Sequence, residues 1–228
     1  ELINLLKENA FTKPVFIRVN DAMDAIGRED IDAISPYQDQ IEAIILPKTQ
    51  SFDFLATLAP MIDFSNKLVP LIETPRAIDT VTQIAAFKDV VGLFFGAADS
   101  SASLGCKLAW EPLLYARQKV VLAAAMYNLF TIDAPFFYID DKEGLKKEAE
   151  AVKNLGFTGK AAIHPDQIDF INESFAPTSE EIAEGKKVLE EYQKSGGGAV
   201  KIDGQMVDEP IAEAMRLKIS LGEEENED

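Results

Sequence analysis

Short runs of apolar residues alternate along most of the chain with longer segments in which apolar residues recur every three or four positions. Runs without an internal polar residue are typical of strands buried on both faces, and a period of about 3.6 residues is typical of helices. Strands and helices that alternate in this way predict a parallel sheet of the α/β class. The expected strands are residues 14–19, 43–46, 67–72, 90–95, 129–132 and 159–163.

The segments between these strands carry the signals of helices. Thr74 is a candidate N-cap followed by Pro75 at the first helical position, and Gly156 is a candidate C-terminal stop. Six strand–helix units leave two folds open. A doubly wound open sheet needs six strands, whereas a closed (β/α)₈ barrel needs eight strands and about 250 residues. For a chain of 228 residues, the pattern alone favours the open sheet.

The alternation stops after residue 175. A linker at 176–179 ends in Ser179, which can cap a following helix. Two short apolar runs then flank Asp203-Gly204, a dipeptide typical of a tight hairpin turn. A last helical segment precedes an acidic tail, and a piece of this size is too small for a stable core of its own, so it needs a surface to pack on. The expected domains are residues 1–175 and 176–228.

The charge of the chain argues against several classes of partner. The sequence has 22 Lys and Arg against 39 Asp and Glu, a net charge of −17, which opposes binding to nucleic acid and to anionic membrane surfaces. The longest apolar runs are far shorter than the roughly 20 residues of a membrane span. The single cysteine, Cys106, excludes an intramolecular disulfide and is typical of a reducing compartment. We expect a cytoplasmic protein that binds neither nucleic acid nor membrane.

Each expected strand ends in a distinctive polar group, at its last residues or directly after them. Because the carboxyl ends of parallel strands share one edge of the sheet, where α/β active sites lie, we expect these side chains to converge. They are Arg18, Lys48, Glu73, Asp99, Asp133 and His164.

Two of these residues are candidate metal ligands. Mg²⁺ prefers oxygen ligands and is commonly held by one or two carboxylates, here Glu73 and Asp99. Each also has a structural interpretation, since Glu73 can stabilise the start of its helix and Asp99 can cap a turn. Arg18 can bind a carboxylate of a substrate with two parallel hydrogen bonds, or it can form an ion pair inside the protein.

Lys48 and His164 also have alternatives. Lys48 can form a Schiff base, as in one class of aldolase, or it can pair with the nearby carboxylates. His164, the one histidine of the sequence, can act as a base or ligand, or hydrogen bonds can fix it beside Pro165. We favour the structural interpretation for both.

Five short motifs of the chain resemble, in the same order, those of the citrate lyase β-subunit-like proteins of the HpcH/HpaI aldolase/citrate lyase family, in particular the stand-alone malyl- and citramalyl-CoA lyases. The resemblance covers about residues 15–214. It implies a (β/α)₈ TIM barrel followed by a small helix–hairpin–helix lid, in place of the open sheet. The motifs are LIETPRA at 71–77, FGAAD at 95–99, LYAR at 114–117, AIHPDQ at 162–167 and DGQMVD at 203–208.

The resemblance also implies roles for individual residues. Glu73 and Asp99 match the Mg²⁺ ligands of the family, and Arg18 matches the arginine that binds the carboxylate of the substrate. Asp208 matches an acid/base aspartate that the lid inserts into the site of the adjacent subunit, which implies a homo-oligomer, by analogy a homotrimer. The implied substrates are 3-hydroxyacyl-CoA thioesters such as malyl-, citramalyl- or citryl-CoA.

The chain departs from the family in two places. Ala98 stands where the family commonly has Glu, which alters the charge beside the metal aspartate. The family also starts with two further βα units, whereas this chain opens near residues 1–8 inside what resembles the helix after the second of them. We therefore expect the first two βα units to be absent from this chain.

The function implied by the resemblance is a Mg²⁺-dependent carbon–carbon lyase. It would cleave or form a 3-hydroxyacyl-CoA thioester, with acetyl-CoA and an α-keto acid as the other side of the reaction. Two alternatives stay open, namely an aldolase that acts on free 2-keto acids and a non-catalytic or regulatory remnant of the family.

Overall fold

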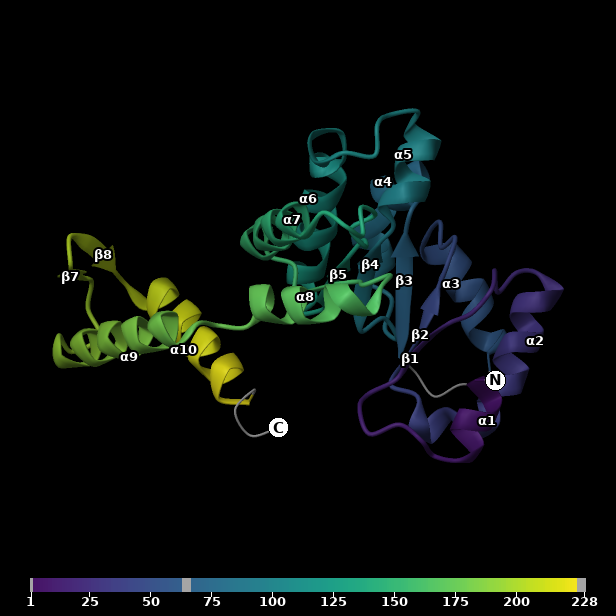
Figure 1. Cartoon of the computed structure of the whole chain (residues 1–228), viewed down its shortest axis with the longest axis horizontal. Coiled ribbons are helices and arrows are strands. Elements are labelled where there is room, and N and C mark those ends of the chain that lie inside the picture. Colours follow the sequence, from purple (N-terminus) through teal and green to yellow (C-terminus); the bar gives the residue numbers. More distant parts are fainter. Residues whose placement is uncertain (1, 63–66, 225–228) are drawn as a thin grey trace. The chain divides into compact units, whose positions relative to one another are not determined.

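The computed structural model describes residues 2–62 and 67–224, so the end of the predicted acidic tail lies outside the described residues. The chain divides into two compact units, Glu1–Gln167 and Ile168–Asp228, and each is described by itself (Figure 1). The assignment of residues 1–175 and 176–228 to a catalytic domain and a lid stays a prediction.

Within the described residues, six parallel strands form the sheet of the first unit, and they pair in the order of the sequence. A doubly wound sheet would instead reverse its strand order partway along. Right-handed crossovers that always step in one direction place all helices on one face, which is the arrangement of a barrel wall. The strands are β1 (Phe16–Arg18), β2 (Ala43–Leu46), β3 (Leu68–Ile72), β4 (Gly92–Phe95), β5 (Phe130–Asp133) and β6 (Gly159–Lys160).

A contact between two aromatic rings shows how strongly this sheet curves. Phe16 of β1 and Phe130 of β5 meet edge to face, with ring centroids 5.7 Å apart. In a flat sheet these strands would be separated by about 19 Å, four times the usual spacing of neighbouring strands. The sheet is therefore a parallel half-barrel, consistent with a TIM-barrel-like fold, and the open sheet favoured by the pattern alone is wrong. The inner face of the half-barrel also carries the apolar residues Ala43, Ile45, Val69, Leu71 and Phe94.

Helices fill the connections between the strands, and α4, α6 and α7 pack on the sheet (Figure 1). Both predicted helix signals are confirmed, since the Thr74 hydroxyl accepts a hydrogen bond from the N–H of Ala77 and Gly156 ends α7 with a φ of 106°. No helix in the described ranges combines the length and apolar character that a membrane crossing needs. The helices of this unit are α1 (Leu2–Lys7), α2 (Ala25–Ile34), η1 (Ser35–Gln40), α3 (Phe52–Leu58), η2 (Ala59–Met61), α4 (Pro75–Ala85), α5 (Ala97–Leu104), α6 (Trp110–Met126), α7 (Lys142–Leu155) and η3 (Pro165–Gln167).

A buried network of charged side chains joins β5 and β6 to two of these helices. Asp133 is fully buried, and its carboxylate accepts hydrogen bonds of 2.8 Å from both Arg117 Nε and Lys160 Nζ. Lys160 also donates to Glu148 of α7 at 2.7 Å. Side chains alternate along a strand, so Asp133 faces away from the side that carries Phe130. The prediction that Asp133 converges with the other polar strand ends is therefore wrong.

The second unit contains two long helices and a hairpin. The predicted hairpin is confirmed, since its strands pair antiparallel and Asp203 and Gly204 have φ values of 47° and 91°, as a tight primed turn requires. The helix cap lies one residue earlier than predicted, at Thr178, which exchanges two hydrogen bonds with Glu181 in a capping box. The elements are α8 (Ile168–Phe175), α9 (Ser179–Lys194), β7 (Val200–Ile202), β8 (Gln205–Val207) and α10 (Glu209–Glu224).

These elements enclose a small apolar core within the second unit. Its buried members come from α9, from both strands and from the start of α10, so the hairpin ties the two helices together. They are Tyr192, Ile202, Val207 and Ala212.

Replacement of Asp133 by Asn should destabilise the first unit strongly. The amide would leave the buried Arg117 without a counter-charge and Lys160 with Glu148 as its remaining partner, and breaking a buried ion pair from one side costs about 3–5 kcal/mol. Urea unfolding measures the change in the free energy of unfolding. Asp140→Asn, at an exposed position, is the matched control and should change it by less than about 0.5 kcal/mol. Similar values for both variants would contradict a structural role of the network.

Candidate active site

The polar residues at the carboxyl edge of the sheet gather around one cavity. The cavity has a volume of about 430 Å³ and includes four of the six polar strand ends that we predicted to converge. They are Arg18, Lys48, Glu73 and Asp99, and the remaining lining residues are Val19, Asn20, Asp21 and Pro47.

The alternation of side chains along the strands explains why these residues meet. Arg18 follows Phe16 by two positions and Glu73 follows Leu71 by two positions, so both continue rows of side chains on the inner face of the sheet. Asp99 reaches the cavity from the first turn of α5, a helix that begins directly after β4. The end of β1, the residue after β3 and the first turn of the helix after β4 thus contribute an arginine and two carboxylates to one place.

The carboxylate of Glu73 is held by the backbone of the neighbouring strand end. Its side chain is almost fully buried, and Oε1 accepts a hydrogen bond of 2.7 Å from the backbone N–H of Lys48. Lys48 has a φ of 55°, a left-handed conformation that residues other than glycine seldom adopt. Such backbone conformations are concentrated at functional sites, and here the turn directs an N–H group at Glu73.

The surroundings of Glu73 change its protonation. The pKa of its carboxyl group is raised from 4.5 to about 7. Burial is the largest cause; the hydrogen bond from Lys48 opposes the rise, and the neighbouring carboxyl group of Asp99 adds to it. The guanidinium group of Arg18 lies close enough to lower the pKa of Glu73 slightly. Two adjacent acids in a partly buried cavity therefore favour a bound proton or a bound cation.

The chemistry of this donor set fits Mg²⁺. A dication removes the repulsion between the ionised carboxylates of Glu73 and Asp99, and Mg²⁺ accepts few protein ligands because it retains water or substrate oxygens in its coordination shell. In the part of the chain that the structure describes, no three His, Cys, Asp or Glu residues are grouped so that they could hold a metal. A closed site of the structural zinc type, which needs four protein ligands, is therefore not formed by these residues.

Arg18 and Lys48 give the same cavity a cationic part. Both residues are exposed, so a ligand that enters the cavity can reach them. The planar guanidinium group of Arg18 can bind a carboxylate through two parallel hydrogen bonds, whereas the lysine ammonium acts as a point charge. A cavity that combines an acid pair with two cationic side chains is suited to a small anionic ligand.

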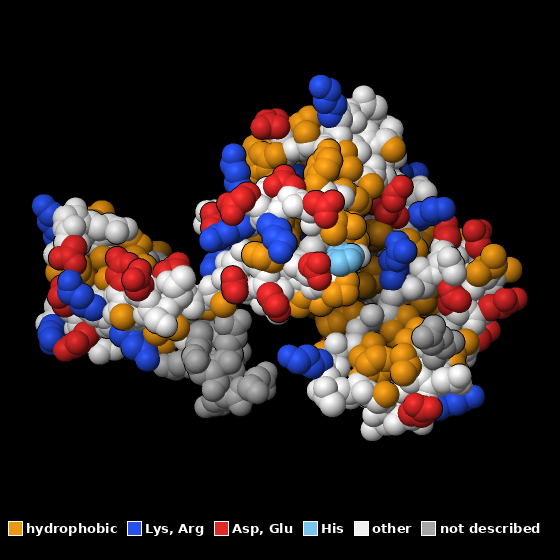
Figure 2. Space-filling view, in the orientation of Figure 1, with side chains coloured by type: hydrophobic (Ala, Val, Ile, Leu, Met, Phe, Trp, Pro, Cys, Tyr) orange, Lys and Arg blue, Asp and Glu red, His pale blue; other side chains and the backbone are white. Residues whose placement is uncertain are grey.

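His164 and Asp208 do not line this cavity. The side chain of His164 is partly exposed at the surface (pale blue in Figure 2), and its Nδ1 atom accepts a hydrogen bond of 3.3 Å from the N–H of Asp166. This agrees with the structural interpretation of the histidine. Asp208 belongs to the second unit, where its carboxylate accepts a hydrogen bond of 3.4 Å from the N–H of Ile211 at the start of α10.

Sequence reasoning missed the contribution of the segment after β1. Asp21 lines the cavity, and its carboxylate accepts a hydrogen bond of 3.1 Å from the N–H of Met23. A Cβ atom at Gly27 of α2 would lie only 2.1 Å from the carbonyl oxygen of Asp21, so a glycine is needed where the helix approaches this turn. The Asn20-Asp21 dipeptide directly after Arg18 was the available signal in the sequence.

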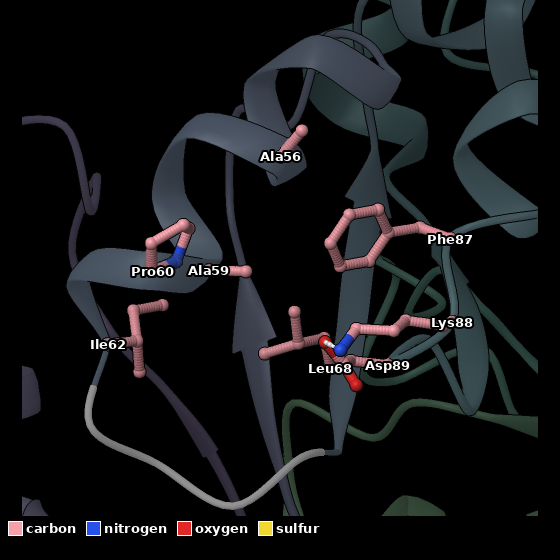
Figure 3. Close-up of a pocket in the computed structure, with 8 residues that line it drawn as sticks. All are labelled: Ala56, Ala59, Pro60, Ile62, Leu68, Phe87, Lys88 and Asp89. Carbon is pink, nitrogen blue, oxygen red and sulfur yellow. Dashed lines mark ion pairs between the residues drawn. The ribbon is translucent and has the colours of Figure 1, made fainter.

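A second cavity of about 400 Å³ lies at the opposite end of the strands and has a different character (Figure 3). Its wall is mainly apolar, and its charged members, Lys88 and Asp89, pair with each other at 3.9 Å. It offers no group of ligands or bases for catalysis. The lining residues are Ala56, Ala59, Pro60, Ile62, Leu68, Phe87, Lys88 and Asp89.

Sequence comparison identifies relatives over most of the chain. Residues 2–165 match the model of the family described as HpcH/HpaI aldolase/citrate lyase. Citrate lyase subunit beta of Haemophilus influenzae is 29% identical over 235 residues, which cover 93% of this chain and 80% of that protein. The human mitochondrial citramalyl-CoA lyase is 30% identical over 230 residues, which cover 90% of this chain and 67% of that protein.

Solved structures share the fold. The CitE protein of Mycobacterium tuberculosis, in complex with magnesium, acetoacetate and coenzyme A, has a TM-score of 0.78 at 28% identity, over 91% of this chain and 78% of that chain. RipC from Yersinia pestis has a TM-score of 0.70 at 40% identity, over 77% of this chain and 83% of that chain. The chain therefore belongs to the HpcH/HpaI aldolase/citrate lyase family, a family of carbon–carbon lyases.

Proposed function

We propose that this chain is a Mg²⁺-dependent lyase that cleaves or forms a 3-hydroxyacyl-CoA thioester such as citramalyl-, malyl- or citryl-CoA. The other side of the reaction is acetyl-CoA and an α-keto acid. The observation that carries the proposal is the pair of adjacent carboxylates, Glu73 and Asp99, in one cavity with Arg18. The relatives named citrate lyase and citramalyl-CoA lyase, and the relative solved with magnesium and coenzyme A, support this substrate class.

Glu73 and Asp99 are the residues that would hold the metal. Mg²⁺ bound there supplies a Lewis acid for the oxygen atoms of the substrate. Arg18 binds the carboxylate of the α-keto acid part and fixes its orientation through its planar donor groups. The turn at Lys48 keeps Glu73 in place, so that the carboxylates of the acid pair are already positioned when the substrate binds.

The reaction requires two proton movements. In the cleavage direction the hydroxyl group of the substrate loses its proton, its oxygen becomes the ketone of the α-keto acid, and the electron pair of the broken bond moves to the carbon beside the thioester carbonyl. That carbon must then gain a proton. We assign this step to Asp208, which would donate the proton in cleavage and remove it in condensation.

The position of Asp208 supports a lid of the kind that the family resemblance implies. Asp208 is half-buried between β8 and the start of α10, within a unit that has its own apolar core. Such a unit can act as one piece that covers a cavity. We propose that it completes the site of an adjacent subunit in a homotrimer.

An activity panel tests the proposed function. The protein with Mg²⁺ should release acetyl-CoA from at least one of malyl-, citramalyl- and citryl-CoA, and EDTA should abolish the reaction until Mg²⁺ is restored. Cleavage of free hydroxy-keto acids in place of the thioesters would instead indicate an aldolase, and trapping by borohydride with substrate would indicate a Schiff base at Lys48. Turnover of none of the compounds would favour a non-catalytic member of the family.

The raised pKa of Glu73 predicts that Mg²⁺ binding weakens as the pH falls. Below about pH 7 the metal-free carboxyl group carries a proton that the metal must displace. The dissociation constant from calorimetric titration should therefore be about tenfold higher at pH 6 than at pH 8, and binding at pH 6 should release about one proton per ion. Glu73→Gln should bind more weakly at both pH values and lose this dependence. An affinity of the unaltered protein that does not change with pH would contradict the prediction.

Replacement of Asp208 by Asn should lower turnover without changing the affinity for Mg²⁺. Loss of a general acid or base reduces kcat by about 10²- to 10⁴-fold. Exchange of the methyl protons of acetyl-CoA in D₂O, followed by NMR, isolates the proton step and should slow in parallel. Asp203→Asn in the same hairpin is the control, because the left-handed turn accepts Asn and should keep normal turnover. Equal kcat values would remove Asp208 from the mechanism.

A further inference from the structure

Gly96 lies against the side chain of Glu73. The two residues directly follow the paired strands β4 and β3, and the N–H of Gly96 donates to the carbonyl of Ile72 at 2.9 Å. A Cβ atom at Gly96 would lie 2.6 Å from Cβ and 3.1 Å from Oε2 of Glu73. Carbon atoms in van der Waals contact are about 3.5–4.0 Å apart, so a side chain at residue 96 overlaps Glu73 in its present position.

The backbone of Gly96 does not itself require glycine. Its φ and ψ values, −100° and 92°, lie in a region that other residues adopt. Gly105 at the end of α5 shows the opposite case, since its φ is 66° and a Cβ atom there would meet nothing within 4 Å. The glycine at residue 96 therefore supplies space beside Glu73, and its backbone freedom is not needed.

Glu73 cannot move away from a larger residue at position 96 without losing its hydrogen bond to Lys48. Its Oε1 atom is held at 2.7 Å by the backbone N–H of Lys48, whose direction is set by the left-handed turn after β2. A Cβ atom at residue 96 would press on both the base of the Glu73 side chain and the other carboxylate oxygen. The carboxylate of Glu73 would therefore shift relative to both Lys48 and Asp99.

We propose that Gly96 is a positioning residue of the acid pair: the space beside its backbone lets Glu73 bond to the Lys48 N–H while its carboxylate stays next to Asp99. Gly96 does not contact the metal or the substrate in this role. The inference rests on the proposed magnesium site, which it deepens, because it makes the affinity for Mg²⁺ depend on a residue that offers no ligand.

The first test compares two glycine-to-alanine variants, one at the start of β4 and one directly after its end. Gly96→Ala should raise the dissociation constant for Mg²⁺, measured by calorimetric titration, by about 10- to 100-fold, as expected when the orientation of a metal ligand is lost. Gly92→Ala is the control, since a Cβ atom there crowds the Phe130 ring at 2.3 Å but lies next to no carboxylate. Its affinity should stay close to that of the unaltered protein. No change in either variant, or an equal loss in both, would overturn the proposal.

The second test needs no metal. Gly96→Ala should lower the urea midpoint of unfolding, and this loss should disappear in a Glu73→Gly background, where the nearest remaining atom of residue 73 is its Cα at 3.5 Å. In a Glu73→Ala background the loss should persist, because the Cβ atom remains. If Gly96→Ala alone fails to fold, the double variant with Glu73→Gly should recover folded protein. An equal loss in the Glu73→Gly background overturns the proposed contact.

The two proposals can fail separately. If the unaltered protein binds no Mg²⁺, the magnesium site is wrong and the positioning role falls with it, even where the unfolding experiment supports the contact. If the unaltered protein binds Mg²⁺ and Gly96→Ala binds it equally well, the magnesium site stands and the role of Gly96 is wrong.

Discussion

Each short strand of the half-barrel places every second side chain on its inner face, and this alternation decides which polar residues can take part in the site. Arg18 and Glu73 each follow an inner apolar residue by two positions and so reach the cavity. Asp133 follows Phe130 by three positions and reaches the helix layer, where Arg117 and Lys160 neutralise it. A shift of one residue in any of these strands would exchange a site residue for a structural one.

The same alternation explains how far the sequence could predict the site. Apolar runs and the polar residues after them are local features, so the sequence predicts the strands and the meeting of Arg18, Glu73 and Asp99. The face on which a side chain lies depends on the orientation of the strand in the folded sheet, which the local sequence does not give. The prediction that Asp133 joins the cavity was therefore wrong. The contact between Phe16 and Phe130 joins segments more than 100 residues apart, and no local pattern encodes the curvature that it reveals. The family motifs, and not the periodicity, led to the barrel.

Smaller differences have equally physical causes. Thr178 and Ser179 are both good caps, but Glu181 stands three residues after Thr178 and can return its hydrogen bond. Helix α5 is short, begins directly after β4 and ends at the left-handed Gly105. In both cases the deciding residue, Glu181 or Gly105, lies within three positions of the helix end that it defines, so the local sequence contains the signal.

The hydrogen bond from Lys48 to Glu73 makes the position of Glu73 independent of the charge that the side chain of residue 48 brings to the cavity. It comes from the backbone, so the side chain at residue 48 can be exchanged without removing the donor, provided that the new residue tolerates a left-handed φ. Asparagine meets that condition without a charge. Divergent members of a family, or a protein engineer, could thus alter which anions the cavity accepts while the geometry of the acid pair is preserved.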